Sequence, residues 1–147
     1  MSKEFFDRST RALDESDSHF SPEEDMMTVA RQVAHVAHTV EWFVDGATKP
    51  EGFDLDFAKH ATDIAGVKSL KAAREWFDRA QKRVLDTIGG MDDSQLQSPL
   101  PAGPVMGGAP RMAIVGAIAD HNAHHRGCLA VYTRLLGKVP PMPYMEM

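Results

Sequence analysis

Apolar residues recur at spacings of three and four almost from end to end of this 147-residue chain, and this period constrains the fold most. The clearest stripe lies in residues 67–88 and consists of Leu70, Ala73, Phe77, Ala80, Val84 and Ile88. Such spacing places the apolar side chains on one face of a helix. No segment shows the alternation of apolar and polar residues, enriched in β-branched side chains, that predicts a half-buried strand. We therefore expect an all-α protein.

Start and stop signals divide this pattern into four predicted helices. The first predicted helix is weak and spans roughly residues 3–16. The second starts at Ser21, Asp25 or Thr28 and ends near Gly46. The third runs from Val67 or Ser69 to Ile88, and the fourth runs from Pro110 to Leu136. Glycines directly follow the third and fourth helices, and glycine is the usual residue after a helix end.

The segments between these helices are long, and two of them contain both proline and glycine. KPEGFDLDF and SPLPAGPVMGGAPR are predicted loops, because proline interrupts regular structure. The tail KVPPMPYMEM is predicted to be an extended strap. A chain of this length predicts a single domain, residues 1–147, folded as a four-helix bundle with long inter-helix loops. Because long connections can join parallel neighbours, the up-and-down order of the helices stays open.

Composition excludes several classes of protein. The net charge is −5 and no long basic run is present, so a nucleic-acid partner is not expected. No apolar stretch reaches the ~18 residues of a membrane-spanning helix, and the first residues lack the apolar segment of a signal peptide. The one cysteine, Cys128, excludes an internal disulfide and fits a reducing compartment. We expect a cytoplasmic protein that binds neither membrane nor nucleic acid.

The fourth predicted helix contains three histidines in the segment DHNAHHRGC. At about 100° per residue, His121 and His125 fall on the apolar stripe one turn apart, whereas His124 lies at its edge. The stripe also contains Ile114, Ala117, Ile118, Cys128, Tyr132 and Leu135. Two imidazoles at this spacing can bind one metal ion, and the alternative is a pair of core histidines bonded to backbone or tyrosine. The zinc-protease motif H-E-x-x-H is excluded, because Asn122 follows His121.

A third ligand has to come from another helix, and the candidates are His19, His35, His38 and His60. On a wheel of the second predicted helix, His35 lies on a mixed face with polar and aromatic residues, Trp42 among them. His38 falls on a charged edge that faces solvent. The wheel favours His35 over His38, and it leaves open that His35 is an ordinary surface histidine.

These segments resemble the DinB-type (DinB–YfiT-like) metalloprotein family. The resemblance is carried by VAHVAHT in the second helix, by HNAHHRGC in the fourth, and by the end RLLGKVPPMPY. It implies a four-helix bundle, commonly dimeric, that binds a divalent metal through His35, His121 and His125. Characterised relatives include thiol-dependent transferases and isomerases. Cys128 stands where the family often has glutamine; it is a candidate fourth ligand, a redox-sensitive thiol or a small core residue.

Three histidines leave a divalent ion with open positions for water or substrate. We therefore expect a metal-dependent enzyme of the thiol S-transferase or hydrolase type that acts on a small molecule, and the resemblance favours a low-molecular-weight thiol cosubstrate. Zn and Ni are the first choices of metal, with Fe, Mn and Cu also suited to imidazole ligands. The alternatives are a non-catalytic metal-binding or stress-related protein and a plain structural bundle. Neither Glu41 nor Glu75 stands out as a general base.

The second predicted helix has two faces that we expect to be buried, namely its valine stripe and the side with His35 and Trp42. A single bundle covers about one face of a helix and part of its flanks. We therefore predict a homodimer with residues of this helix in or near the interface, as the family resemblance also implies.

Overall fold

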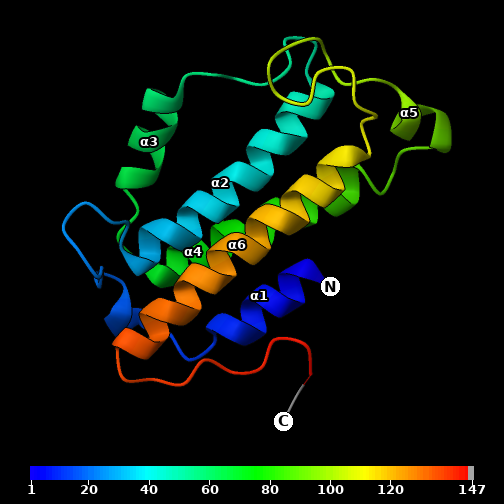
Figure 1. Ribbon diagram of the computed structural model, residues 1–147. Coiled ribbons are helices and arrows are strands. Elements are labelled where there is room, and N and C mark those ends of the chain that lie inside the picture. Colours follow the sequence, from blue (N-terminus) through cyan, green and yellow to red (C-terminus); the bar gives the residue numbers. More distant parts are fainter. Residues whose placement is uncertain (146–147) are drawn as a thin grey trace.

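A computed structural model describes residues 1–145; the last two residues of the predicted tail strap, Glu146 and Met147, lie outside the described part. Within that part the chain forms helices and no named strand. In chain order the elements are α1 (Ser2–Thr10), the 3-10 helix η1 (Glu15–Asp17), α2 (Val29–Thr48), α3 (Phe57–Ala65), α4 (Leu70–Thr87), α5 (Asp93–Gln97) and α6 (Ala113–Leu135). The prediction of an all-α protein is confirmed (Figure 1).

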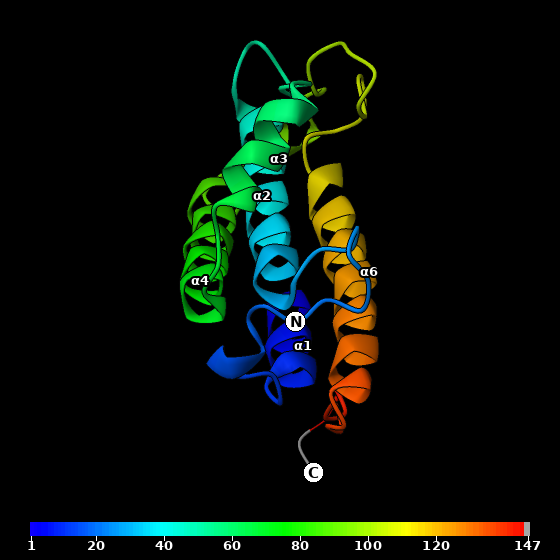
Figure 2. The same ribbon diagram turned by 90° about the vertical axis from the view of Figure 1, so that its left-hand side faces the viewer.

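The bundle consists of α1, α2, α4 and α6, with α2 packed against both α4 and α6 and with α1 packed against α6. Helices α2 and α4 run in one direction, while α1 and α6 run in the other (Figures 1 and 2). Ser18 shows why α2 and α4 are parallel: its carbonyl accepts from Ala30 N and its hydroxyl accepts from Leu70 N, so both helices start beside it. The long connection between α2 and α4 therefore joins parallel neighbours, whereas the one between α4 and α6 joins helices that run in opposite directions (Figures 1 and 2).

Side-chain caps fix where α2 and α4 begin. Thr28 accepts a hydrogen bond from Arg31 N and Ser69 accepts one from Ala72 N, as N-cap residues do. Of the three predicted starts of the second helix, the structure selects the one at Thr28. The helix then continues past Gly46, because this glycine is a packing residue and not a stop. A Cβ added at Gly46 would lie 2.3 Å from Phe53 Cδ1.

Two short helices, α3 and α5, lie beside the two predicted loops in the segments between the long helices. Asp56 caps α3 by accepting from Lys59 N, and Asp92 forms a reciprocal capping box at the start of α5. The proline-rich segment before α6 holds an isolated antiparallel bridge between Pro99 and Pro110. The first helix is shorter than predicted and ends at Thr10. Its expected second half becomes a turn and η1.

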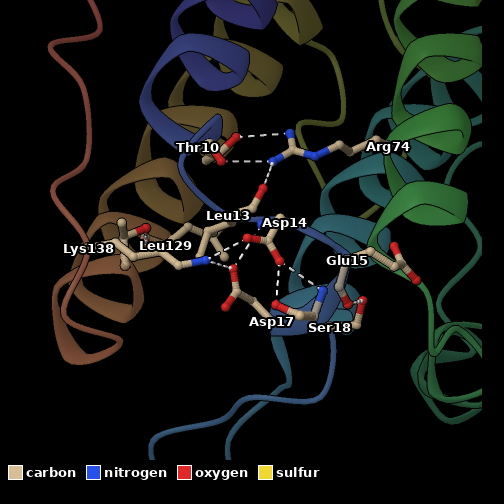
Figure 3. A network of polar contacts seen from close by, with 11 residues as sticks. Thr10, Leu13, Asp14, Glu15, Asp17, Ser18, Arg74, Leu129 and Lys138 are labelled. Carbon is tan, nitrogen blue, oxygen red and sulfur yellow. Dashed lines mark hydrogen bonds and ion pairs between the residues drawn. The ribbon is translucent and has the colours of Figure 1, made fainter.

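A set of polar contacts, here called the anchoring network, holds the connection after α1 to the rest of the bundle (Figure 3). Arg74 of α4 donates to Thr10 Oγ1 at 3.1 Å, to Thr10 O at 2.8 Å and to Leu13 O at 3.4 Å. Lys138, just after α6, donates to Asp14 Oδ2 at 2.9 Å. Three segments far apart in sequence thus meet at one end of the bundle.

Helix α2 lies at the centre of the core, and each of its residues from Val29 to Ala47 is buried or half-buried. Phe6 of α1 packs on Phe77 of α4 with ring centroids 4.8 Å apart, which closes the core at the end where α1 lies. Among the described residues, none of the helices is both long and apolar enough to cross a membrane.

Candidate metal centre

His35 of α2 and His121 and His125 of α6 come together where these two helices pack. Each ring offers one nitrogen, and these three nitrogens all lie within 4.8 Å of one another. His35 Nε2 and His121 Nε2 are 3.2 Å apart. The ring centroids are separated by 4.5 to 5.0 Å. The structure therefore brings together the three residues that the sequence selected; their role as metal ligands remains a prediction.

The buried face of α6 is rotated from the one predicted. Its buried residues are Ile114, Ile118, Asn122, His125, Leu129, Tyr132 and Thr133. Helix α1 causes the shift: it packs on α6, and Asn122 Nδ2 donates to Ser2 Oγ of α1 at 3.0 Å. Leu135, predicted to be core, is 59% exposed. His121 lies at the flank of the buried face, half-buried, whereas His125 lies within it.

The two rings on α6 differ in the partners of their nitrogens. Gln32 Nε2 lies 3.2 Å from His125 Nδ1, and because an amide nitrogen only donates, Nδ1 accepts and Nε2 carries the hydrogen in this arrangement. Turning the Gln32 amide by half a turn brings Oε1 to Nδ1 instead, so that Nδ1–H donates and Nε2 keeps its lone pair for a metal ion, as in protein sites that orient a metal-binding imidazole. His121 Nδ1 is buried without a hydrogen-bond partner, and so is Gln32 Oε1. The cluster thus contains more buried polar atoms than the protein itself satisfies.

Burial keeps these imidazoles neutral. Desolvation, with a further contribution from the neighbouring histidines, lowers the pKa of His121 to about 4 and that of His125 to about 3. Desolvation also lowers the pKa of His35. Neutral imidazole is the form that binds a metal ion, so at neutral pH the cluster presents lone pairs without first releasing protons. The residues present therefore fit a divalent metal.

A cavity of about 270 Å³ opens beside two of the three rings. Its lining consists of His35, His38, Thr39, Trp42, Phe43, Phe57, His60, Ile64 and His121, contributed by α2, α3 and α6. The lining includes His35 and His121 but not His125. An ion held by the three rings would thus be reached from the cavity side, where a water or substrate could occupy an open position.

His38 does not face solvent as the wheel predicted. It is half-buried, with its ring edge-on to Trp76 at 5.9 Å and 4.8 Å from the ring of His60. The wheel failed here because α3 and α4 both pack on α2 and cover this side of the helix. His60 was among the candidates for the third ligand but was not selected, and its segment was not predicted to be helical. Its signal was present: Phe57, His60 and Ile64 follow a helical spacing behind the cap Asp56.

Cys128 does not join the three-histidine group. Its sulfur lies 3.9 Å from His124 Nε2, and the two residues form a separate potential ligand group with His125. Because Cys128 is half-buried, it is not a core residue either.

The remaining acidic and histidine candidates are placed elsewhere. The Glu41 carboxylate accepts from Trp76 Nε1 at 3.0 Å, and Glu75 is exposed. His19 is exposed in the connection before α2. None of the residues that line the cavity is a carboxylate.

Comparisons with known proteins agree with this fold. A family model described as the DinB superfamily matches residues 5–129, a span that includes all three histidines. A solved structure of a DinB-like protein, YjoA from Bacillus subtilis, superimposes with a TM-score of 0.66, covering 99% of this chain and 93% of that one at 15% identity. At that identity the likeness shows the fold. A search of curated proteins gives no match.

Proposed function

This chain belongs to the DinB superfamily, and we propose that it is a divalent-metal-dependent enzyme that acts on a small molecule. The metal is held by His35, His121 and His125. The observation that carries the proposal is the convergence of three neutral imidazoles, one buried and two half-buried, from two helices beside an apolar cavity.

When bound, a divalent ion supplies Lewis acidity, which lowers the pKa of a coordinated water or stabilises a thiolate. The protein's own groups do the rest. Gln32 orients the His125 ring through its outer nitrogen. Trp42 and Phe43 exclude water from the cavity side of His35. Because the lining is mainly apolar, it suits a substrate with an apolar group next to its reacting atom.

Two reaction types fit this site, transfer of a thiol sulfur to an electrophile and hydrolysis. The transferase, with a low-molecular-weight thiol as cosubstrate, is favoured by the family likeness. It is also favoured by the absence of a carboxylate among the described residues of the cavity lining, because a metal-stabilised thiolate needs no general base for its attack. Zn and Ni are the preferred metals, and imidazole ligands also suit Fe, Mn and Cu.

The same missing carboxylate favours a second candidate, a metal-binding or stress-related protein of this superfamily without turnover. Glu41 cannot readily serve as a base, since its carboxylate is bonded to the Trp76 indole. The single cysteine supports a cytoplasmic location for either candidate.

A homodimer also remains a proposal, but the two faces of α2 no longer support it. Both faces of α2 are covered within one chain by α4, α6 and α3, so this helix does not demand a partner. The support now comes from the family likeness and from apolar side chains that α6 exposes, namely Val115, Val131 and Leu135. Light scattering at micromolar concentration tests it: a mass near that of one 16.2 kDa chain would refute the dimer.

The enzyme proposal is tested with metal-free protein reloaded with Zn²⁺ or Ni²⁺ and assayed for thiol transfer to an electrophile and for ester hydrolysis. We expect turnover in the wild type and in His19→Ala, which changes an exposed histidine outside the site, and none in His121→Ala. Metal uptake without turnover would select the second candidate. A folded protein that takes up neither metal would overturn both.

A further inference from the structure

A second group of potential metal-ligating side chains lies at the same cavity, and two of its three members, His38 and His60, belong to the lining. His38 of α2 and His60 and Asp63 of α3 each offer one ligand atom, and these atoms lie within 4.8 Å of one another. The group shares no residue with His35, His121 and His125. Metal binding by this group therefore does not depend on whether the first site holds a metal.

His60 is prepared to act as a ligand. Its Nε2 lies 3.1 Å from the carbonyl oxygen of Asp54, an acceptor only, so Nε2 carries the hydrogen and Nδ1 carries the lone pair. That Nδ1 is buried and has no hydrogen-bond partner. A backbone carbonyl behind one nitrogen and a free lone pair on the other is the usual arrangement of a metal-binding imidazole. The His60 side chain is only 14% exposed, which makes an unmet lone pair unfavourable.

His38 and Asp63 complete the donor set. Burial, with the neighbouring His60 next in effect, lowers the pKa of His38, so its ring is neutral and able to bind at neutral pH. Its position is fixed by the edge-on contact with Trp76. Asp63 is exposed and follows His60 by three residues, so both project from the same side of α3. It adds a carboxylate oxygen to the two imidazole nitrogens.

We propose that His38, His60 and Asp63 form a second divalent-cation site, selective for metals that accept nitrogen and oxygen ligands, such as Zn²⁺ or Ni²⁺. Two imidazoles and one carboxylate form an established donor set for Zn²⁺, with water in the remaining position. This site joins two elements, α2 and α3. Only Ile64 of α3 is buried, so the helix has little apolar packing of its own. A metal here ties α3 to α2 and fixes the cavity wall formed by Phe57, His60 and Ile64.

The experiment is a titration of the metal-free full chain with Zn²⁺, with bound ions measured by equilibrium dialysis and elemental analysis. We expect His60→Ala and Asp63→Asn each to bind one ion fewer than the wild type, or to bind that ion on the order of tenfold more weakly or worse. His121→Ala should lose the other ion and keep this one. His19→Ala is the matched control for loosely bound surface metal and should equal the wild type.

Asp63→Asn keeps the test decisive if His60→Ala does not fold, because Asp63 is exposed and caps no helix. The proposal is overturned if both variants bind as many ions, as tightly, as the wild type, or if the wild type binds no ion that survives in His121→Ala. Failure of the first site gives a different pattern, in which His121→Ala matches the wild type.

A fluorescence readout locates the ion. Trp76 lies against His38, so Cu²⁺ bound at the second site should quench tryptophan emission in His121→Ala, where the first site is disabled. The quenching should vanish on adding Asp63→Asn. Quenching that persists unchanged in the double variant would place the ion elsewhere and contradict the proposal.

Discussion

The anchoring network and the three-histidine cluster are both polar groups that join several elements, but they differ in how they are satisfied. In the network, Arg74 meets two backbone carbonyls and a hydroxyl of residues 10–13. Within residues 1–145, none of the residues labelled in Figure 3 leaves a buried side-chain nitrogen or oxygen without a partner. In the cluster, His121 Nδ1 and Gln32 Oε1 are left unmet.

This difference in hydrogen bonding suggests that the anchoring network stabilises the fold and that the three-histidine cluster serves function. Folding alone selects for buried polar groups that satisfy one another, since an unmet buried group costs about 1–3 kcal/mol. The cluster keeps such groups beside three imidazole nitrogens that lie within 4.8 Å of one another, and this arrangement suits a metal ion better than it suits folding. The network should therefore govern the free energy of unfolding and the cluster should govern metal affinity.

The largest expected difference between the three-histidine cluster and the anchoring network is in the affinity for Zn²⁺. His125→Ala should weaken Zn²⁺ binding at the first site by more than ~100-fold, because even an outer-shell partner is worth ~10–100-fold. Arg74→Ala should leave that affinity within about threefold, since Arg74 contacts residues 10–13 and none of the histidines. Isothermal titration calorimetry of both variants with Zn²⁺ measures these affinities. Equal losses of affinity in the two variants would contradict the assignment of metal binding to the cluster alone.

The free energy of unfolding should respond more to a change in the anchoring network than to a change in the three-histidine cluster. Arg74→Ala removes the donor of the Leu13 carbonyl and one of the two donors of the Thr10 carbonyl, which keeps its bond from Leu13 N, and we expect it to lower the free energy of unfolding by about 1–3 kcal/mol. Metal-free His121→Ala should cost less, because the substitution also removes an unpartnered buried nitrogen. Urea unfolding of the metal-free proteins measures both. A larger loss in His121→Ala would mean that the cluster is structural.

A sharper test compares neighbours on α2. His35→Ala should abolish the tight first site, whereas His38→Ala should leave it within a few-fold, because only His35 lies in the group with His121 and His125. If His38→Ala weakens the tight site as much as His35→Ala does, the assignment of the third ligand is wrong. Competition with a chelator resolves the tight site from any weaker one.

The smallest expected effect is a difference in pH dependence of the metal-free protein. His121 and His125 have a folded pKa of about 4 and about 3, below the ordinary value of 6.5, so the unfolded chain binds more protons between these values. Stability from the cluster is thus complete above about pH 6.5 and falls as the pH drops towards 3.

Asp14 in the anchoring network titrates lower. Its hydrogen bonds with Ser16, followed by Lys138, lower its pKa from 3.8 to about 2, so its contribution is present above pH 3.8 and is lost as the pH falls towards 2. His121→Ala should reduce the slope of the stability curve between pH 6.5 and 4, whereas Asp14→Asn should lower the curve evenly above pH 3.8 and change its slope only below that value. Identical curves for the two variants would contradict these assignments.

Much of the site was predictable because its helices have strong signals. The apolar stripes and the caps Thr28 and Ser69 define α2 and α4, and the i, i+4 spacing of His121 and His125 defines a shared face. These are local properties of the sequence. They place His35 near the pair once α2 and α6 pack.

What could not be predicted depends on packing between elements. Helix α3 has a cap and a short apolar spacing, but it buries only Ile64, so the sequence does not show that it packs on α2. The rotation of α6 follows from its contact with α1, as the bond between Asn122 and Ser2 shows. The burial of His38 follows from α3 and α4 together. A wheel drawn for one helix contains none of this information.

The most direct test of the account is X-ray absorption spectroscopy of the wild-type protein reconstituted with one equivalent of Zn²⁺. We predict a first shell with three imidazole nitrogens at about 2.0–2.1 Å and one oxygen, changed in His35→Ala, His121→Ala and His125→Ala but not in His19→Ala. A folded wild type that retains no Zn²⁺ or Ni²⁺, or a first shell that is the same in all four variants, would contradict the central claim.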